Sequence, residues 1–457
     1  MRRLCQTNTR SLSMSRRQIL TGVGASALTL GVLPAAASVP RDPEVVVIGA
    51  GAAGLAATRR LMDMGISVAC IEAQDRIGGR AYTEHETFGV PYDRGCHWLE
   101  SSHMNPWIEF GLTNGFAVYP EHSEDDERVF IGSRELTDPE WEDLDATWYA
   151  MNDEIGVAGR GRQDVSPKDV VTSTGPWAPL CEGWIGPWEM GKDFDQFSCQ
   201  DWWTGEGGQS YFCTQGFGTL VQHYGSDIPV ELNTPASVVR WGGDGVEVET
   251  PAGTVRAQVA IITVSTGVLA AEGIRFDPPL PPSKQESFHR ISMGIYNNIA
   301  LQFSEDIFGF GADVYVDRQV ESVEAAGWLS NISGSNLMFG YSGGRFGREL
   351  ERAGVAAAVD FGISELRKFL GSSIDKKFIK GDFTRWGEDP WFQGSYASAD
   401  PGYYPMRREL NTPEADKIYF AGEACSGQLW ATAAGALESG LLAAQRAGWA
   451  FKNQQLP

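Results

Sequence analysis

The sequence predicts an α/β fold that begins with a Rossmann-like βαβ unit, and three observations support this prediction. Residues 44–48 (EVVVI) form a short apolar run of the kind found in buried parallel strands. Residues 49–54 (GAGAAG) follow at once and fit G-x-G-x-x-G. A helical pattern and a second apolar run, 66–71, then lead to the acidic Glu72. These parts stand in the order that binds a dinucleotide.

The glycines of this turn have different steric roles. Gly49 allows the tight turn, Gly51 lets the backbone approach a pyrophosphate, and Gly54 lets the helix pack closely on the strand. Ala53 belongs to the helix N-terminus, whose free N–H groups and positive dipole end attract phosphate. The carboxylate of Glu72 lies where it can accept hydrogen bonds from ribose hydroxyls. The alternative is an ordinary α/β domain with a glycine-rich turn.

The residues after the second strand indicate which dinucleotide is bound. Residues 72–80 (EAQDRIGGR) match E-A-x-x-R-x-G-G-R and resemble the flavin amine oxidases, which include monoamine oxidases, polyamine oxidases and histone lysine demethylases. The resemblance implies FAD as the cofactor. Gly79 lets the backbone lie against it, and Arg76 and Arg80 supply fixed positive charge beside its pyrophosphate.

Length and charge restrict the partners. The chain has 457 residues, enough for two or three domains, and a formal net charge of −22. Nucleic acid is not expected as a partner because binding of its phosphates needs basic patches, so a demethylase acting on chromatin is also disfavoured. The charge is compatible with a cationic substrate. The seven cysteines show no metal-site spacing and no readable disulfide framework.

Residues 1–37 resemble a twin-arginine signal peptide. Arg16 and Arg17 precede an apolar stretch at 19–33, and residues 35–37 (AAA) offer a cleavage site. The apolar stretch is only about 15 residues long and is broken by glycines, which is too short for a membrane span. We therefore expect a bacterial protein that is exported with its FAD to the periplasm or beyond, and no membrane span in the mature chain.

Residues 91–100 (PYDRGCHWLE) resemble the D-x-G-x-x-W segment of the family, where the chain passes the flavin and reaches the substrate tunnel. Glu100 coincides with a position at which some polyamine oxidases have a carboxylate or a histidine facing the amine. A surface carboxylate is the alternative for Glu100. His97 is expected to be a structural or tunnel residue rather than a base. The acidic, tryptophan-rich residues 121–204 are expected to begin the substrate domain.

Two positions in the middle of the chain follow from the same resemblance. Residues 293–303 (MGIYNNIALQF) align with M-G-x-x-x-K-x-x-L-x-F, with Asn298 in place of the lysine. That lysine normally holds a water near flavin N5, so its absence is the clearest departure from the family pattern. The backbone near Ala236 is expected to meet the adenine end of FAD.

The C-terminal segment carries the most specific resemblance. Residues 386–396 (WGEDPWFQGSY) match W-x-x-D-x-x-x-x-G-S-Y, beginning at Trp386. Ser395 stands where some members attach flavin through a cysteine, so non-covalent FAD is implied. Tyr396 matches one wall of the family's aromatic cage, while Thr432 replaces the tyrosine of the opposite wall. Trp430 is a candidate for the missing aromatic face. Core packing is the alternative for both aromatic residues.

The second flavin motif is expected where the strand at 418–420 reaches Gly422 and Glu423. Ala433 begins the final helix, whose N-terminus should face the electron-rich N1/O2 edge of the flavin. The resemblance implies a discontinuous FAD domain (42–120, 205–290 and 381–457) and a mixed α+β substrate domain (121–204 and 291–380).

The implied reaction is oxidation of an amine at its α-carbon to an imine, which hydrolyses to an aldehyde and ammonia or a smaller amine. The cofactor performs the redox step, and O2, giving H2O2, or a periplasmic acceptor takes the electrons. Two alternatives stay open. One is a flavoprotein of the same fold that acts on an amino acid or another substrate, with Arg94 as a weak candidate for binding a carboxylate. The other is a non-catalytic FAD-binding partner protein.

Overall fold

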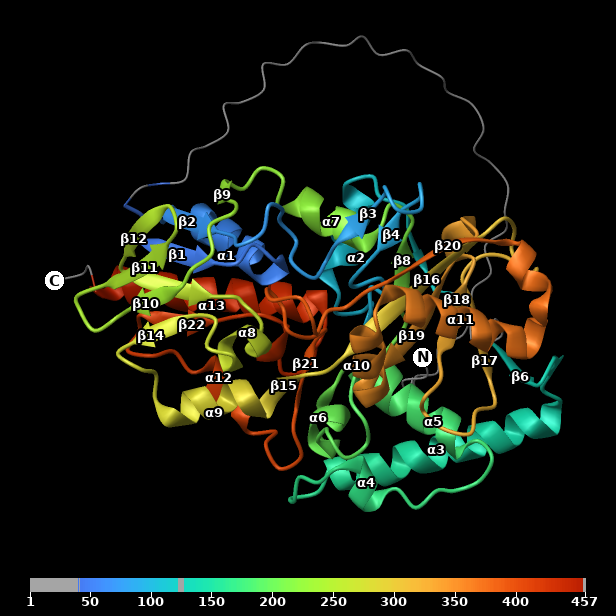
Figure 1. Ribbon diagram of the computed structural model, residues 1–457. Coiled ribbons are helices and arrows are strands. Elements are labelled where there is room, and N and C mark those ends of the chain that lie inside the picture. The colour runs from blue at the N-terminus through green and yellow to red at the C-terminus, as the bar shows by residue number, and fades with distance from the viewer. Residues whose placement is uncertain (1–39, 41, 122–126, 455–457) are drawn as a thin grey trace, which may run out of the picture.

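The computed structural model describes residues 40, 42–121 and 127–454. The expected signal peptide at 1–37 lies outside the described residues. Figure 1 shows two halves, one built around helices α1 and α13 and the other around strands β16–β20 with helices α3 and α11. A cofactor domain and a substrate domain were expected, and the exact boundaries between them stay a prediction.

The first half contains a parallel five-stranded sheet. Its order is β22 (Ile418–Phe420), β13 (Val259–Ile262), β1 (Val45–Ile48), β2 (Val68–Ile71) and β9 (Val230–Glu231). Every residue of β1, β2, β13 and β22 is buried, as expected for parallel strands covered on both faces. The second predicted strand begins at Val68 rather than residue 66, because the Ile66 N–H donates to Leu61 O and closes the preceding helix.

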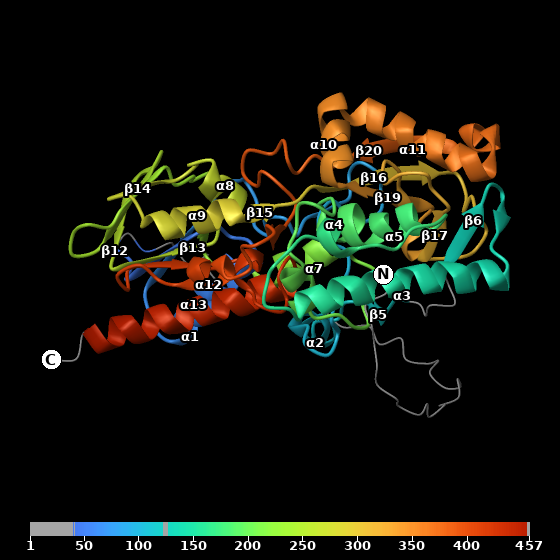
Figure 2. The same cartoon turned by 90° about the horizontal axis from the view of Figure 1, so that it is seen from below.

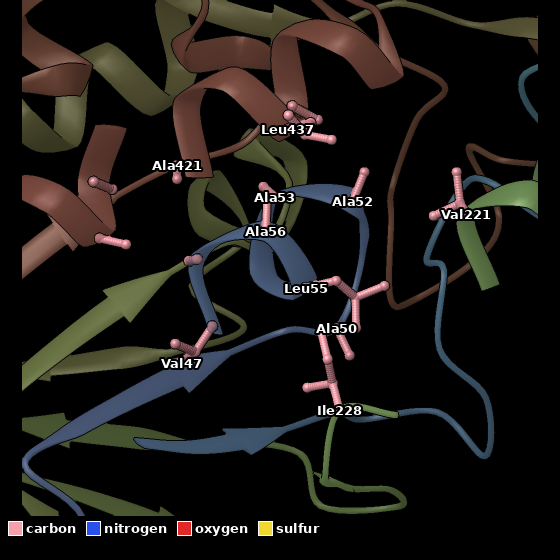
Figure 3. Packing of buried hydrophobic residues seen from close by; sticks show 14 of the residues in the cluster. Val47, Ala50, Ala52, Ala53, Leu55, Ala56, Val221, Ile228, Ala421 and Leu437 are labelled. Atoms are coloured by element: carbon pink, nitrogen blue, oxygen red, sulfur yellow. The ribbon is translucent and has the colours of Figure 1, made fainter. Parts of the chain in front are cut away.

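Helices α1 (Ala52–Asp63) and α13 (Ala433–Gln454) pack together on this sheet (Figure 1). Figure 3 shows the core beneath them, in which Val47 of β1, Leu55 of α1 and Leu437 of α13 belong to one apolar cluster. The contact requires glycine, because a Cβ on Gly440 would lie 2.1 Å from the Ala53 carbonyl oxygen. A Cβ on Gly54 would lie 1.8 Å from the carbonyl oxygen of Gly49. The predicted packing role of Gly54 is thus explained.

A second, four-stranded sheet packs on the other side of the parallel sheet. Its order is β12 (Gly253–Ala257), β11 (Val246–Thr250), β10 (Val238–Arg240) and β14 (Arg275–Asp277). Val239 and Val248 of this sheet share an apolar cluster with Val46 and Ile48 of β1. The alternating side chains of β1 are therefore buried against different layers.

The second half is organised around a seven-stranded sheet. Its order is β20 (Phe378–Phe383), β16 (Tyr296–Phe303), β19 (Leu337–Gly343), β18 (Gly327–Ser330), β17 (Val314–Arg318), β6 (Arg128–Ile131) and β7 (Arg134–Glu135). Only the β17–β6 pair is parallel. The predicted fold class, a Rossmann-like α/β domain joined to a mixed α+β part, is confirmed.

Helices cover both faces of this sheet. Helices α10 (Gly344–Ala353) and α11 (Val355–Leu370) lie beside it in Figure 2, and Leu366 and Phe369 of α11 pack on Ile299 and Leu301 of β16. The opposite layer holds α3 (Asp138–Gly159), α5 (Ala178–Ile185) and the π-helix η2 (Gly186–Met190). The tryptophan-rich segment therefore mostly forms core and also supplies one wall of the cavity described below.

The remaining elements are short and connect these layers. They are β3 (Thr83–Glu84), β4 (Tyr92–Asp93), α2 (Pro106–Thr113), β5 (Val118–Pro120), α4 (Pro167–Val170), α6 (Cys199–Thr204), β8 (Tyr211–Cys213), α7 (Phe217–Tyr224), α8 (Thr266–Ala270), α9 (Pro282–Arg290), β15 (Ile291–Met293), η3 (Ile332–Gly334), η4 (Ser372–Lys376), β21 (Ala397–Ala399), α12 (Met406–Asn411) and η5 (Glu423–Cys425). Among the described helices, none combines the length and apolar character that a membrane span requires.

Candidate active site

One continuous cavity joins the carboxyl ends of the parallel strands to the aromatic face of the seven-stranded sheet. It is lined at one end by Ile48 and Ile71, the last residues of β1 and β2, and at the other by Tyr296 of β16. Its volume, including the open mouth, is about 1810 Å³. Its lining runs from the glycine-rich turn after β1 to the aromatic residues of the other half, so a dinucleotide and a substrate can lie end to end along it.

The dinucleotide end collects most of the residues predicted to bind the cofactor. The residues lining it are Gly49, Gly51, Ala53, Glu72, Gly79, Arg80, Ala236, Trp386, Gly422, Glu423 and Ala433. A Cβ on Gly422 would point into open space, at a φ of 143° that disfavours other residues. No side chain caps the first turn of α1, so its N–H groups are left for a phosphate. The geometry fits a dinucleotide cofactor.

Glu72 is fixed as a hydrogen-bond acceptor before any ligand binds. Its Oε2 accepts from the Ala50 N–H at 2.6 Å, and its Oε1 accepts from the Gln74 N–H at 2.9 Å. Burial raises the pKa of Glu72, and the backbone donors oppose this shift by stabilising the carboxylate. Each oxygen keeps acceptor capacity for the ribose hydroxyls that the sequence predicts.

Two predicted residues do not line the cavity. Gly54 lies beneath the turn and acts through packing, as expected. Arg76 points along its own loop, where its guanidinium donates to the Gly79 carbonyl oxygen at 2.8 Å and stacks on Tyr82 at 3.9 Å. Its guanidinium thus braces the loop whose backbone lines the cavity, and its expected position beside the pyrophosphate stays a prediction.

Arg80 lines the cavity, but its charge is paired. Its Nη1 donates to Glu423 Oε1 at 2.9 Å and to the Ser395 carbonyl oxygen at 2.7 Å. The other carboxylate oxygen of Glu423 accepts from the Ala397 N–H at 3.2 Å. This ion pair links the segment 72–80 to the segments 386–396 and 418–423. It therefore fixes the shape of the site as well as contributing charge to it.

The other end of the cavity brings together the predicted substrate residues. Glu100, Asn298, Tyr396, Trp430 and Thr432 all line it. The hydroxyl of Tyr396 donates to the Glu189 carbonyl oxygen at 2.8 Å, and its ring lies 5.9 Å from that of Tyr296. Glu100 is half-buried in the cavity wall, so the surface alternative does not describe its position.

Trp430 combines the two interpretations that the sequence left open. It lines the cavity and also belongs to the apolar core of the substrate half. The guanidinium of Arg407 lies 5.7 Å from its ring, and that guanidinium is itself paired with buried Asp201. The next residue, Ala431, has a φ of 64°, a strained conformation for alanine that re-aims the chain between Trp430 and the final helix.

Thr432 caps the final helix instead of forming an aromatic wall. Its Oγ1 accepts from the Gly435 N–H at 3.0 Å and donates to the Leu429 carbonyl oxygen at 2.8 Å. Ala433, the first residue of α13, lines the cavity. The positive end of the α13 dipole therefore opens on the cavity, as the sequence predicts.

Asn298 is a buried, uncharged side chain at the position of the family lysine. Its Nδ2 donates to the Asp93 carbonyl oxygen at 3.4 Å, and its Oδ1 has no partner among the described residues. The only lysines or arginines in the described cavity lining are Arg80 and Arg94. Arg94 is paired with Asp382 at 2.5 Å, which disfavours it as the carboxylate-binding residue of an amino acid oxidase.

Four further residues line the substrate end: Trp98, Trp188, Glu189 and Tyr296. The two tryptophans lie in segments that the sequence assigned to the tunnel and the substrate domain, whereas Glu189 and Tyr296 were not singled out. Trp188 and Glu189 lie in the π-helix η2, a rare turn that is frequent at functional sites but has no simple sequence signal. Burial, and then the charges of Glu189 and Glu100, raise the pKa of Tyr296 well above its usual value. Both carboxylates therefore lie near one aromatic ring.

His97 is held in the interior. Its Nδ1 lies 2.8 Å from Asp93 Oδ2, and its ring packs between Phe212 and Phe339 at 5.1 and 5.3 Å. The same carboxylate oxygen accepts from the Phe217 N–H at 3.1 Å. These contacts agree with the structural role expected for His97.

Comparison with known proteins decides the family. The family model described as flavin containing amine oxidoreductase matches residues 182–447, which is more than half of the chain. The chain belongs to this family. A second model, described as an NAD(P)-binding Rossmann-like domain, matches residues 47–110. The protein is thus an FAD-dependent amine oxidoreductase, as the sequence predicted.

Members of the amine oxidoreductase family resemble this chain over most of its length. Polyamine oxidase 4 of Oryza sativa subsp. japonica is 29% identical over 440 residues, which cover 88% of each chain. Polyamine oxidase 2 of Arabidopsis thaliana is 28% identical over 449 residues, covering 89% of this chain and 88% of the relative. Lysine-specific histone demethylase 2 of Homo sapiens is 26% identical, over 92% of this chain and 56% of the relative.

Solved structures of two amine oxidases share the fold. Wild-type putrescine oxidase bound to putrescine superposes with a TM-score of 0.73 at 19% identity, covering 88% of this chain and 98% of that one. Cyclohexylamine oxidase from Brevibacterium oxydans IH-35A gives a TM-score of 0.74 at 22% identity, covering 90% and 100%. At these identities the likeness concerns the fold.

Proposed function

We propose that this amine oxidoreductase oxidises a primary or secondary amine at its α-carbon, with diamines or polyamines favoured. One observation carries the preference: Glu100 and Glu189 line the same end of the cavity as the rings of Tyr296, Tyr396 and Trp430. The aromatic faces suit the carbon chain and the reacting amine, while a carboxylate suits a second, cationic amine. The polyamine and putrescine oxidases among its relatives agree with this preference.

The residues of the chain prepare the amine for oxidation. FAD bound in the cavity supplies the two-electron oxidant, and the α-carbon gives up the equivalent of a hydride. Before that step the reacting amine must lose its proton, and an apolar, aromatic wall favours the neutral form by desolvation. No protein base is needed for this. The resulting imine hydrolyses to an aldehyde and ammonia or a smaller amine.

The second half-reaction is proposed to use an acceptor other than O2 at least in part. The two described arginines in the cavity lining are ion-paired, and Asn298 brings no charge. Reduction of O2 begins by forming superoxide, an anion that a nearby cation stabilises. A site without a free cation should react slowly with O2, which favours a periplasmic cytochrome or quinone as acceptor.

An anaerobic amine screen tests the proposed substrate class. Purified FAD-loaded protein is mixed with monoamines, diamines, polyamines and amino acids, and the flavin absorbance is followed. Bleaching is expected with amines, fastest with diamines or polyamines. Bleaching by amino acids alone would support an amino acid oxidase. No bleaching by any compound would support a non-catalytic FAD-binding protein.

Non-covalent attachment of FAD is proposed from Ser395. Its hydroxyl donates to the Tyr296 carbonyl oxygen at 2.7 Å and accepts from the Tyr296 N–H at 2.8 Å, so it ties the segment before β21 to the start of β16. Acid or heat should release all flavin from the protein. Flavin that remains with the denatured chain after gel filtration would contradict the proposal.

Export by the twin-arginine route to a bacterial periplasm is proposed from residues 1–37 of the sequence. The test compares the wild-type chain with the double substitution Arg16→Lys and Arg17→Lys in a bacterial host. The wild type should reach the periplasm in a shortened form, and the variant should stay in the cytoplasm at full length. Equal export of both would contradict the route.

A further inference from the structure

A second cavity lies outside the flavin site and has no role in the proposed reaction. Its volume, including the open mouth, is about 1260 Å³. Helix α10 forms one wall, α9 with β15 forms the other, and the floor comes from the chain after η2 and after β21. Figure 1 shows α10 close to β15 and β21, at the place where the two halves of the molecule meet.

Cationic side chains outnumber acidic ones in this cavity, although the whole chain has a net charge of −22. The cationic residues that line it are Lys192, Arg290, Arg345, Arg348 and Arg352, and the acidic ones are Asp195, Glu349 and Asp400. The lining itself is therefore net positive on a strongly acidic protein, which favours an anion, while Asp193, Glu286 and Glu351 lie directly behind it.

Two of the cations are held by neighbouring groups. Arg345 donates to Asp193 at 2.8 Å and to Asp195 at 2.7 Å. Lys192 is buried at the floor, where its Nζ donates to Ser292 Oγ at 2.8 Å and lies 3.3 Å from Asp400 Oδ1. Burial lowers the pKa of Lys192 in spite of Asp400, so further negative charge beside it would stabilise the ammonium.

The other three guanidinium groups have long ion pairs or none, and that of Arg290 also stacks over the Tyr403 ring, 4.0 Å from its centroid. Arg290 lies 3.5 Å from Glu286 and 4.0 Å from Asp400, and Arg348 lies 3.9 Å from Glu351. Arg352 makes no ion pair with any described residue. Arg348 and Arg352 are four residues apart on α10 and therefore share one face, opposite Arg290.

We propose that this cavity binds a small anion carrying two or more negative charges, of the phosphate or polycarboxylate type. The planar guanidinium groups of the two walls match the paired oxygens of carboxylate and phosphate. Arg290 and Arg352 contact the anion from opposite sides, and Lys192 adds charge from the floor. The site is separate from the flavin cavity and needs no amine to form.

The anion site is coupled to the substrate end of the flavin cavity through short backbone contacts. Gly294, directly after β15, donates to the Tyr396 carbonyl oxygen at 2.7 Å. Ile295 donates to the Gly191 carbonyl oxygen at 2.8 Å, two residues after Glu189. Because Tyr396 and Glu189 line the flavin cavity, we expect an anion bound between the two walls to affect the amine site through these contacts.

Calorimetric titration of the FAD-loaded enzyme tests binding directly. Inorganic phosphate and citrate are titrated separately, at one pH and with ionic strength held constant by sodium chloride. Saturable heat is expected from at least one of them. The anion that gives it shows whether the site prefers a phosphate or a polycarboxylate. No saturable heat from either anion would overturn the proposal.

Matched variants locate the site. Arg290→Gln and Arg352→Gln, on opposite walls, should each weaken binding by about tenfold because each removes charge-assisted hydrogen bonds. Arg275→Gln changes an exposed arginine of β14, far from this cavity in the fold, and should bind as the wild type does. An equal loss of anion affinity in all three variants would indicate a general charge effect and would overturn the proposed location of the site.

Coupling is tested with amine turnover and rests on the proposed function. A saturating anion should change KM for the best amine at least twofold, and Arg352→Gln should abolish the response. An unchanged KM would overturn the coupling. If no amine reduces the flavin, the proposed function fails while the calorimetric result on the anion site still stands.

Discussion

The two ends of the flavin cavity are built in different ways. At the dinucleotide end, the largest group of predicted residues comes from one segment, 49–80, in which Gly49 and Gly51 act through backbone geometry and backbone N–H donors hold the Glu72 carboxylate. The substrate end takes Glu100, Glu189, Tyr296 and Tyr396 from four distant parts of the chain. A substitution at the first end should therefore remove the cofactor, whereas one at the second should alter substrate choice and leave the cofactor bound.

Two buried carboxylates, one in each half of the molecule, differ in how their oxygens are satisfied. Glu72, at the dinucleotide end, has backbone N–H donors on both oxygens. Asp317, in the seven-stranded sheet, accepts from Trp184 Nε1 at 3.0 Å on Oδ2, and its Oδ1 has no partner among the described residues. Burial, and then the charge of Glu127, raise the pKa of Asp317 to about 8.

The largest effect is expected from Gly54→Ala. The new Cβ would lie 1.8 Å from the Gly49 carbonyl oxygen, so the turn or helix α1 must move. We expect loss of most bound FAD and destabilisation by about 3 kcal/mol. The measurements are flavin absorbance per chain and thermal unfolding. Gly243→Ala, where a Cβ meets no atom within 4 Å, is the control. A Gly54→Ala protein that still binds one FAD per chain would contradict the view that this end of the cavity controls cofactor binding.

Asp317→Asn should stabilise the protein at neutral pH by a few kcal/mol. The folded state holds a proton on Asp317 up to about pH 8, whereas an unfolded aspartate releases it near pH 4, so stability falls as pH rises between these values. Asparagine removes this dependence and still accepts from Trp184. Thermal unfolding of both proteins from pH 5 to 8 measures the effect. A constant difference across that range would contradict a titrating Asp317.

Asn298→Lys should speed reaction of the reduced enzyme with O2 by about tenfold or more, since it restores a cation where superoxide forms. Reduction of the flavin by the amine should change less. Stopped-flow mixing with air-saturated buffer measures reoxidation, and Asn114→Lys, at an exposed helix end, is the control. If the wild type already reoxidises as fast as substrate reduces it, and the variant gains nothing, the protein is an ordinary oxidase.

The smallest effect is expected from Glu100→Gln or Glu189→Gln. Each should raise KM for diamines about fivefold more than KM for monoamines, because desolvation offsets part of the attraction between carboxylate and ammonium. Steady-state kinetics with a diamine and a monoamine of equal length measure the ratio, and the exposed Glu321→Gln is the control. Equal changes in KM for both substrates would contradict a contact between the carboxylate and the second ammonium group of the diamine.

The anion cavity shows a further limit of sequence reading. Arg290 and Arg352 are separated by more than sixty residues and carry no motif, yet they line opposite walls of one cavity. Arg80 lines the flavin cavity, and its pairing with Glu423 joins residues 343 positions apart. Neither arrangement has a local sequence signal, because it depends on which distant elements the packing brings together.

The sequence by itself determined the family, the FAD-binding βαβ unit and the departure at Asn298. These follow from short patterns in which steric limits act within a few residues, such as the space that Gly54 must leave for Gly49. Only the tertiary structure decided that Arg76 braces a loop, that Thr432 caps α13 and that Glu189 joins Glu100 beside Tyr296. The reason is physical: a glycine acts on its neighbours in the chain, whereas a substrate pocket is formed where separately folded layers meet.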